Sequence, residues 1–125
     1  MPTDSTYTGT GWEVCPAAFT SLLKRVAAEY ANPVVFLHRE RLGVLRPAGR
    51  ARSRVQDPLR VEYLRSHLGA VRAALAAGVE SRGDFAWSLI DNHEWAHGYS
   101  KRFGIVHVDY ATQWRTPKDS ARFYQ

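Results

Sequence analysis

A predicted helix over residues 57–78 lies between two short apolar runs, and this order constrains the fold more than any other feature of the sequence. Asp57 is a favourable N-cap ahead of a proline, and Gly78 suits the C-terminal end. The apolar side chains between them recur at helical spacing: Val61, Leu64, Leu68, Val71 and Leu75. The flanking runs, VVFL at 34–37 and FAWSLI at 85–90, are typical of buried strands, the first of a strand buried on both faces. A strand, a helix and a strand in this order favour parallel strands in an α/β fold.

The rest of the chain is expected to add two helices and one more strand. The expected elements are a loop at 1–10, a helix from Pro16 to near Tyr30, a loop at 38–56, a polar turn at 80–84, a strand at 105–110, and a helix that begins with Thr116 as its N-cap and Pro117 at its first position. Two parallel strands leave both sheet edges unpaired and apolar faces exposed. The sequence therefore predicts part of a larger sheet within a single domain.

The net charge of +5 belongs to one segment of the chain. Residues 39–54 contain six arginines and one acidic residue, Glu40, whereas the remainder has 11 basic and 11 acidic residues. Clustered arginines can bind a polyanion such as a nucleic acid. The segment has no interleaved aromatic residues, and no recognisable binding module surrounds it. We therefore interpret residues 38–54 as an anomalous, solvated Arg-rich loop, and nucleic acid is not the expected partner.

The N-terminal sequence has neither the basic nor the apolar region of a signal peptide, and no run approaches the roughly 20 apolar residues of a membrane helix. We expect a cytoplasmic protein with no membrane partner. The single cysteine, Cys15, cannot form an internal disulfide. Its neighbours Val14 and Pro16 predict a small buried side chain rather than a reactive thiol.

Residues 93–97, HEWAH, match the H-E-x-x-H pattern of zinc proteases. That chemistry needs the five residues within a helix, so that the two histidines lie one turn apart, and a third ligand beyond it. Asp91 and Asn92 before the motif and Gly98 after it predict turns instead. We therefore expect no metal and no cofactor, and we interpret His107 as a packed or half-exposed histidine rather than a third ligand.

Trp87, Glu94 and Trp95 are the residues best suited to bind a ligand. Carbohydrate sites stack a sugar ring on indole and hold its hydroxyls with carboxylates and indole N–H groups. Two core tryptophans beside an exposed glutamate would produce the same pattern. The spacing of these residues leaves both interpretations open.

A family resemblance favours the sugar interpretation. The segment WSLIDNHEWAHGYSKRFGIVHVDYATQWRTPKDSARFY, at 87–124, strongly resembles the C-terminal part of glycoside hydrolase family 1, the β-glucosidases and β-galactosidases. That family has the pattern W-S-L-x-D-N-x-E-W-x-x-G-Y-x-x-R-F-G-L-x-x-V-D-Y, followed by R-x-P-K-x-S. The similarity extends to GWEVCPAAFTSLL at 11–23 and VQDPLRVEYLRSHLGAVRAAL at 55–75.

The resemblance implies a TIM barrel, of which the chain would hold helix 6, strand 7, helix 7, strand 8 and the start of helix 8. Sites in such barrels lie at the C-terminal ends of the strands. Trp87, Glu94 and Trp95 match family residues that bind hydroxyls of the non-reducing sugar. Phe103 matches an aromatic residue that lines the same subsite. Position 93, often aromatic in the family, is histidine here.

The family hydrolyses glycosides with retention, using two glutamates about 5 Å apart. The acid/base belongs to strand 4, which nothing in this chain matches. The nucleophile belongs to an I-T-E-N-G motif at the end of strand 7. An ungapped match places His38 at that position, and Glu40 lies two positions later. We therefore expect neither catalytic glutamate in this chain, with Glu40 as a poor substitute.

A frame-shifted segment would explain this departure. Back-translation of residues 38–46 with ordinary codons, read from the second base of each codon, encodes T-E-N-G-S-A-Y-Y-D, which contains the missing motif. We hypothesise that the frame changes near Leu37 and is restored before Val55. The same event would account for the local excess of arginine.

These observations predict a C-terminal fragment of a β-glucosidase that binds a β-glucoside or related β-glycoside but is inactive alone. A non-catalytic sugar-binding piece, or one that complements a separate N-terminal part of the barrel, is the alternative. A polyanion-binding module is the third possibility.

Overall fold

The computed structural model describes residues 6–39, 48–51 and 54–125. Its elements are α1 (Pro16–Glu29), β1 (Val35–Arg39), β2 (Ala48–Ala51), β3 (Arg54–Gln56), α2 (Pro58–Ala76), β4 (Ser81–Ala86), β5 (Val106–Val108), β6 (Arg115–Pro117) and α3 (Asp119–Tyr124). None of the described helices has the length and apolar character that would let it cross a bilayer.

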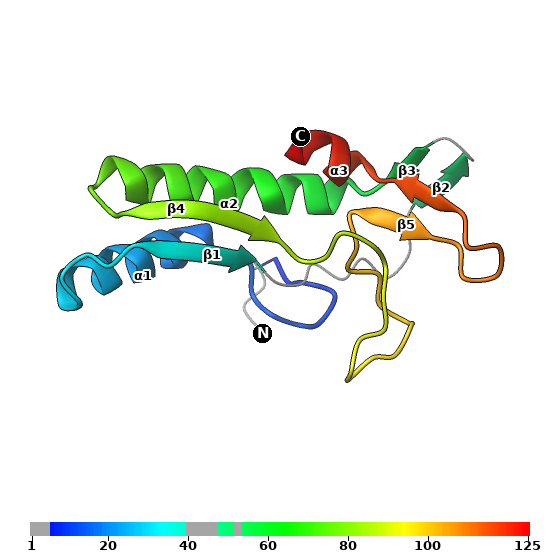
Figure 1. The fold of residues 1–125 in the computed structure, drawn as a ribbon, viewed down its shortest axis with the longest axis horizontal. Helices are drawn as coiled ribbons and strands as arrows, with labels where there is room; N and C mark the ends of the chain where they lie inside the picture. Colours follow the sequence, from blue (N-terminus) through cyan, green and yellow to red (C-terminus); the bar gives the residue numbers. More distant parts are fainter. Residues whose placement is uncertain (1–5, 40–47, 52–53) are drawn as a thin grey trace.

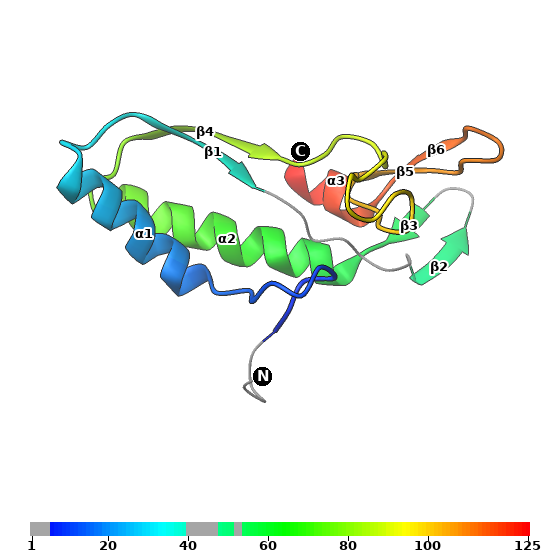
Figure 2. The same ribbon diagram turned by 90° about the horizontal axis from the view of Figure 1, so that it is seen from below.

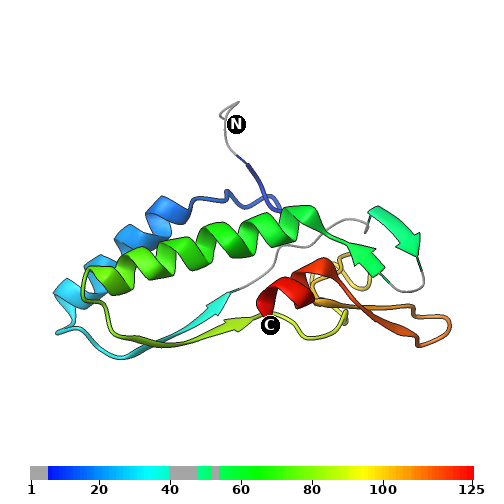
Figure 3. The same ribbon diagram turned by 90° about the horizontal axis from the view of Figure 1, so that it is seen from above.

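Strands β1 and β4 form a parallel pair joined through α2, as the order of elements predicts. Their register places Phe36 opposite Gly83 and His38 opposite Phe85. Helices α1 and α2 run along one face of the pair, and the views from below and above show no described element on the other face (Figures 1, 2 and 3). Because the strands are parallel and end together, at Arg39 and Ala86, both carboxyl ends lie at the start of the loop that follows β4.

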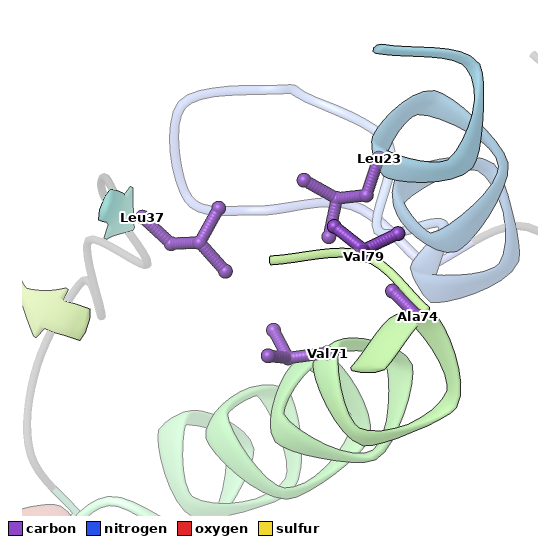
Figure 4. Close-up of a cluster of buried hydrophobic side chains, with 5 residues drawn as sticks. All are labelled: Leu23, Leu37, Val71, Ala74 and Val79. Atoms are coloured by element: carbon purple, nitrogen blue, oxygen red, sulfur yellow. The ribbon is translucent and has the colours of Figure 1, made fainter. Parts of the chain in front are cut away.

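The hydrophobic core lies between the two strands and the two helices (Figure 4). It consists of buried side chains from α1, β1, α2 and the turn before β4: Leu23, Leu37, Val71, Ala74 and Val79. Burial of each larger aliphatic side chain contributes about 1.5–3 kcal/mol to the free energy of folding. This cluster fixes α1 and α2 against the covered face of the sheet.

The opposite face of the sheet is exposed and apolar. The side chains of Phe36 and Phe85 are 64% and 54% exposed, and their rings lie 6.5 Å apart. The prediction that the run at 34–37 is buried on both faces is therefore wrong, because helices cover only one face. The prediction of a two-stranded sheet with an open apolar face is confirmed.

Strand β4 begins earlier and ends earlier than the sequence predicts. The polar turn expected at 80–84 is wrong, since the strand starts at Ser81. Pairing with β1 decides this, because Gly83 leaves room for the ring of Phe36, whose Cδ1 would lie 2.7 Å from a Cβ at that position. The predicted strand at 85–90 is also wrong beyond Ala86. Residues 88–91 leave β4 and bond to residues 103–106 instead.

The remaining named strands form two short antiparallel pairs. β5 confirms part of the strand predicted at 105–110, and it pairs with β6. Thr116 lies within β6, so its predicted N-cap role is wrong, and α3 begins after Lys118. The predicted loop at 38–56 is also partly wrong, because β1 continues to Arg39 and β2 pairs with β3.

The N-terminal helix α1 matches its prediction, but the residue before it does not. Cys15 is the N-cap residue of α1 and is exposed, so the prediction of a buried thiol is wrong. The buried stripe of the helix begins later, at Phe19 and Leu23, which pack against the core. Local apolar neighbours in the sequence therefore did not determine burial at position 15.

Candidate functional site

The four predicted sugar-binding residues lie at or beyond the carboxyl end of β4. Trp87 follows the strand directly and is 39% exposed. The other three belong to the segment 91–104, which we call the site loop. Within it Trp95 is 94% exposed, whereas Glu94 and Phe103 are buried. The loop therefore presents one indole to solvent and buries one carboxylate.

The side chain of His38 lies against Trp87. The two ring centroids are 5.6 Å apart with an interplanar angle of 58°. This contact follows from the parallel register, since β1 and β4 end side by side. Position 38 and a predicted sugar-binding indole therefore share one edge of the sheet. Glu40, the predicted poor substitute for the nucleophile, lies outside the described residues.

The H-E-x-x-H motif forms a tight turn. The backbone N–H of Glu94 donates to the carbonyl of Gly98 at 2.8 Å, and the reverse bond is 2.6 Å. Gly98 has φ +56°, a left-handed conformation that glycine adopts readily. The non-helical geometry predicted for this motif is confirmed. Over the described ranges, no set of three His, Cys, Asp or Glu side chains converges as metal ligands.

A buried carboxylate organises the base of the site loop. Asp91 is 3% exposed and its Oδ1 accepts hydrogen bonds from Lys118 Nζ at 2.8 Å and from the Gly104 N–H at 3.0 Å. Its Oδ2 accepts from the Val108 N–H at 3.3 Å and lies 3.2 Å from His107 Nδ1. One side chain thus connects the first and last residues of the loop with β5 and the start of α3.

A second buried pair lies under the loop. Arg60 on α2 donates to three consecutive carbonyls, those of Arg102 (2.6 Å), Phe103 and Gly104 (3.1 Å). Its Nε lies 3.5 Å from Asp57 Oδ2. Burial lowers the pKa of the Arg60 guanidinium, and the charges of Asp57 and Asp91 oppose that effect.

Asp57 caps a helix other than the one it precedes. Its side chain makes no capping bond to α2. Instead it accepts hydrogen bonds from the N–H of Ser120 at 2.8 Å and from the Ser120 hydroxyl at 2.5 Å, in the first turn of α3. Burial raises the pKa of the Asp57 carboxyl, although the bonds from Ser120 act in the opposite direction. The N-cap predicted from sequence is right in position and wrong in role.

Lys118 completes this polar core. It is 1% exposed, and burial together with the charge of Arg60 lowers the pKa of its ammonium to about 8, although the ion pair with Asp91 raises it. The lysine is therefore charged below about pH 8. The chain accepts this buried charge because Asp91 and Asp57 face it.

Sequence reasoning missed Asp91, Arg60 and Lys118. The stripe predicted on α2 is displaced, because its buried residues are Arg60, Leu64, His67, Ala70, Val71 and Ala74, and Leu75 is exposed. An arginine at a core-facing helical position was the available signal, since a buried arginine requires acceptors. His107 was predicted correctly as a packed histidine, and it is buried beside Asp91.

Acidification is expected to destabilise the fold through His107. Burial and the charges of Arg102 and Lys118 lower its pKa below the ordinary 6.5, although Asp91 opposes this. Below pH 6.5 the unfolded chain binds a proton that the folded chain excludes, so stability falls as the pH falls. Urea titrations between about pH 7.5 and 5.5 should show this slope, and His107→Gln should reduce it. An equal dependence of stability on pH in the natural chain and in His107→Gln would contradict the attribution of this dependence to His107.

Comparison with known proteins places the chain in a defined group. The profile of glycosyl hydrolase family 1 matches residues 2–125. Beta-glucosidase A of Thermotoga maritima is 45% identical over 117 residues, which are 94% of this chain and 26% of that protein. The bifunctional beta-D-glucosidase/beta-D-fucosidase of Bifidobacterium breve is 41% identical and aligns with all of this chain and 28% of its own.

Solved structures agree with these sequence matches. A psychrophilic beta-glucosidase from Micrococcus antarcticus superposes with a TM-score of 0.88 at 47% identity, over 97% of this chain and 26% of that one. The Thermotoga maritima family 1 glycoside hydrolase, complexed with a cyclophellitol analogue, gives a TM-score of 0.88 at 43% identity, over 99% and 28%. The chain therefore spans about a quarter of the length of the relatives it matches.

Proposed function

The chain belongs to glycosyl hydrolase family 1. We propose that it forms the sugar-binding part of a β-glucosidase barrel and does not cleave glycosides by itself. Its substrate in that role is a β-glucoside or a related β-glycoside. Solved relatives carry inhibitors such as deoxynojirimycin and isofagomine lactam, which supports a sugar-sized ligand.

The contact between His38 and Trp87 carries this proposal. Sites in α/β barrels lie where parallel strands end, and these two side chains meet at such an edge. Trp87 would support the sugar ring beside position 38, while Glu94 and Trp95 would bind hydroxyls and Phe103 would line the subsite from below. These roles come from the matched family positions, and the placement beyond β4 is compatible with them.

The order of elements supports the assignment to a specific part of the barrel. On this reading α1 is helix 6, β1 is strand 7, α2 is helix 7, β4 is strand 8 and α3 is the start of helix 8. The open edges and the exposed apolar face of the β1–β4 pair are the surfaces that the remaining strands of a barrel would cover.

The absence of cleavage follows from the residue at position 38. A retaining glycosidase needs a carboxylate nucleophile, and an imidazole beside Trp87 cannot form the glycosyl ester of that mechanism. A frame-shifted segment between Leu37 and Val55 accounts for the substitution. The coding DNA tests this directly, since codons 38–46 must encode T-E-N-G in the alternate frame.

Reconstitution of the barrel tests the proposal. The chain is mixed with the remaining portion of the Thermotoga maritima relative, and hydrolysis of an aryl β-glucoside is measured. We expect background rates with the natural chain and rates on the order of a thousandfold higher with His38→Glu or Arg39→Glu. The ungapped match places the nucleophile at position 38, whereas the alternate reading frame places its glutamate at position 39. His38→Gln is the matched control, since it has the size of the glutamate without its charge.

Three outcomes would contradict the proposal or favour an alternative. Hydrolysis by the natural chain alone, lost on Glu40→Gln, would identify Glu40 as a working nucleophile. Assembly with the relative's portion and deoxynojirimycin binding, without activity for either glutamate variant, would favour a non-catalytic sugar-binding or complementing piece. Salt-dependent retention on heparin that requires the arginines of 39–54 would instead support a polyanion binder.

A further inference from the structure

One carboxylate holds the two ends of the site loop together. Asp91 is its first residue and Gly104 its last, and the Gly104 N–H donates to Asp91 Oδ1 at 3.0 Å. The backbone N–H of Asp91 also donates to the carbonyl of Val106 at 3.0 Å. The position of this side chain therefore determines how far apart the two ends of the loop lie.

The carboxylate is held by a residue outside the loop. Lys118, between β6 and α3, reaches Asp91 Oδ1 at 2.8 Å, and its own backbone N–H donates to the carbonyl of Ile105 at 2.9 Å. Both side chains are almost completely buried. The other charged groups that face the ammonium are Asp57, which precedes α2, and Arg60 on α2, while His107 from β5 lies at the far oxygen of Asp91. Lys118 alone among the cations donates within 3 Å to Asp91 in the described structure.

A continuous series of contacts leads from this carboxylate to the tip of the loop. The guanidinium of Arg102 lies 3.6 Å from Asp91 Oδ2 and 3.9 Å above the ring of Tyr110. Tyr110 packs edge-on against Tyr99, with centroids 4.7 Å apart, and Tyr99 packs edge-on against His93 at 5.2 Å. His93 directly precedes Glu94. A displacement of Asp91 would therefore be transmitted to the residue beside the proposed sugar ligand.

We propose that Lys118 is a positioning residue for the sugar-binding loop, and that it acts through Asp91 to set the placement of Glu94 and Trp95. This inference rests on the proposed function for its consequence, sugar affinity, but its structural part stands on the hydrogen bonds of Asp91. A buried ion pair with only a charge-balancing role is the competing interpretation, because either partner alone would be costly to bury.

Two variants separate these interpretations. Lys118→Met leaves a buried carboxylate without its nearest cation, so both interpretations expect lower overall stability. The double variant Asp91→Asn with Lys118→Met removes both charges. Charge balance alone expects it to behave like the natural chain. Positioning expects the loop to remain displaced, since the asparagine oxygen can accept from only one of the Gly104 and Val108 N–H groups and its NH2 cannot accept from the other.

Amide hydrogen exchange at about pH 6.5, where Lys118 is charged, provides the readout. The probes are the hydrogen-bonded amides of Glu94, Gly98 and Gly104 in the loop, compared with amides in the middle of α2. In the double variant we expect α2 protection to return to within a factor of about two while loop exchange stays about tenfold faster. Lys24→Met, the same substitution on the exposed side of α1, should change neither.

Loop protection that recovers together with α2 in the double variant would overturn the inference, as would unchanged loop exchange in Lys118→Met. Deoxynojirimycin binding, followed by tryptophan fluorescence in the chain reconstituted with the relative's portion, is measured in parallel. Weaker binding by about tenfold in the double variant is the expected result. If the natural chain fails to bind the inhibitor, the proposed function fails, but hydrogen exchange still decides the role of Lys118.

Discussion

Gly104→Ala is expected to lower the free energy of unfolding by about 3 kcal/mol or more. A Cβ at this position would overlap the backbone nitrogen of Asp91 and the carbonyl carbon of Ile90, and it would lie 2.7 Å from the Ile90 oxygen. All three contacts are backbone atoms, so no side-chain rotation can relieve them. The two ends of the site loop, Asp91 and Gly104, must therefore move apart.

Gly69→Ala is the matched control for this substitution. Gly69 lies within α2, and an added Cβ would meet nothing within 4 Å. Alanine has the higher helix propensity, so the variant should be about 0.5–1 kcal/mol more stable than the natural chain. Urea midpoints at constant m-value measure both changes. Similar midpoints for the two variants would contradict the close approach of residues 90–91 to residue 104.

Asp57→Ala is expected to cost about 3–5 kcal/mol, because it removes one partner of a buried ion pair. Arg60 would lose its nearest carboxylate, and the N–H of Ser120 at the start of α3 would lose its acceptor. Domains of this size have a total stability of about 5–15 kcal/mol, so the variant should be close to unfolding. Loss of the near-ultraviolet circular dichroism signal at low urea is the measurement.

Glu62→Ala serves as the control for Asp57→Ala. Glu62 pairs with Arg65 on the same helix, three residues away, but both side chains are more than 60% exposed. Exposed pairs at this spacing contribute only about 0.2–0.5 kcal/mol. Asp57→Asn, which retains an acceptor for Ser120 without the charge, should lie between the two alanine variants. An Asp57→Ala midpoint equal to that of Glu62→Ala would show that the buried Asp57–Arg60 pair contributes no more to stability than the exposed Glu62–Arg65 pair.

The local sequence pattern predicted the elements that are specified by their own residues. Residues 57–78 have helical spacing and a helix-compatible proline, and α2 forms there almost to the residue. The parallel pairing of β1 and β4 also followed from the order of elements, because a helix-length connection favours parallel strands. The start of β4, which pairs with β1 far earlier in the chain, was not predicted, and neither were the short strands β2, β3 and β6.

The motif resemblance suggested candidate site residues but not their support. Trp87 and Trp95 were proposed because indole and carboxylate residues in one segment suggest sugar binding, and Phe103 because it matches a family position. Asp91 was read as a turn former, since aspartate before asparagine is typical of turns. Its five polar neighbours come from segments up to 27 residues away, and no local pattern reports them.

The sequence by itself determined the family, the helix α2, the parallel strands around it and the composition of the site loop, because these depend on residue order and local spacing. Only the tertiary structure decided which polar side chains are buried together. Asp57 caps α3 rather than α2, and Lys118 lies against Asp91, because the folded backbone brings these positions within hydrogen-bonding distance. A buried charge is stable only where its partner lies in space, and that partner can be anywhere in the chain.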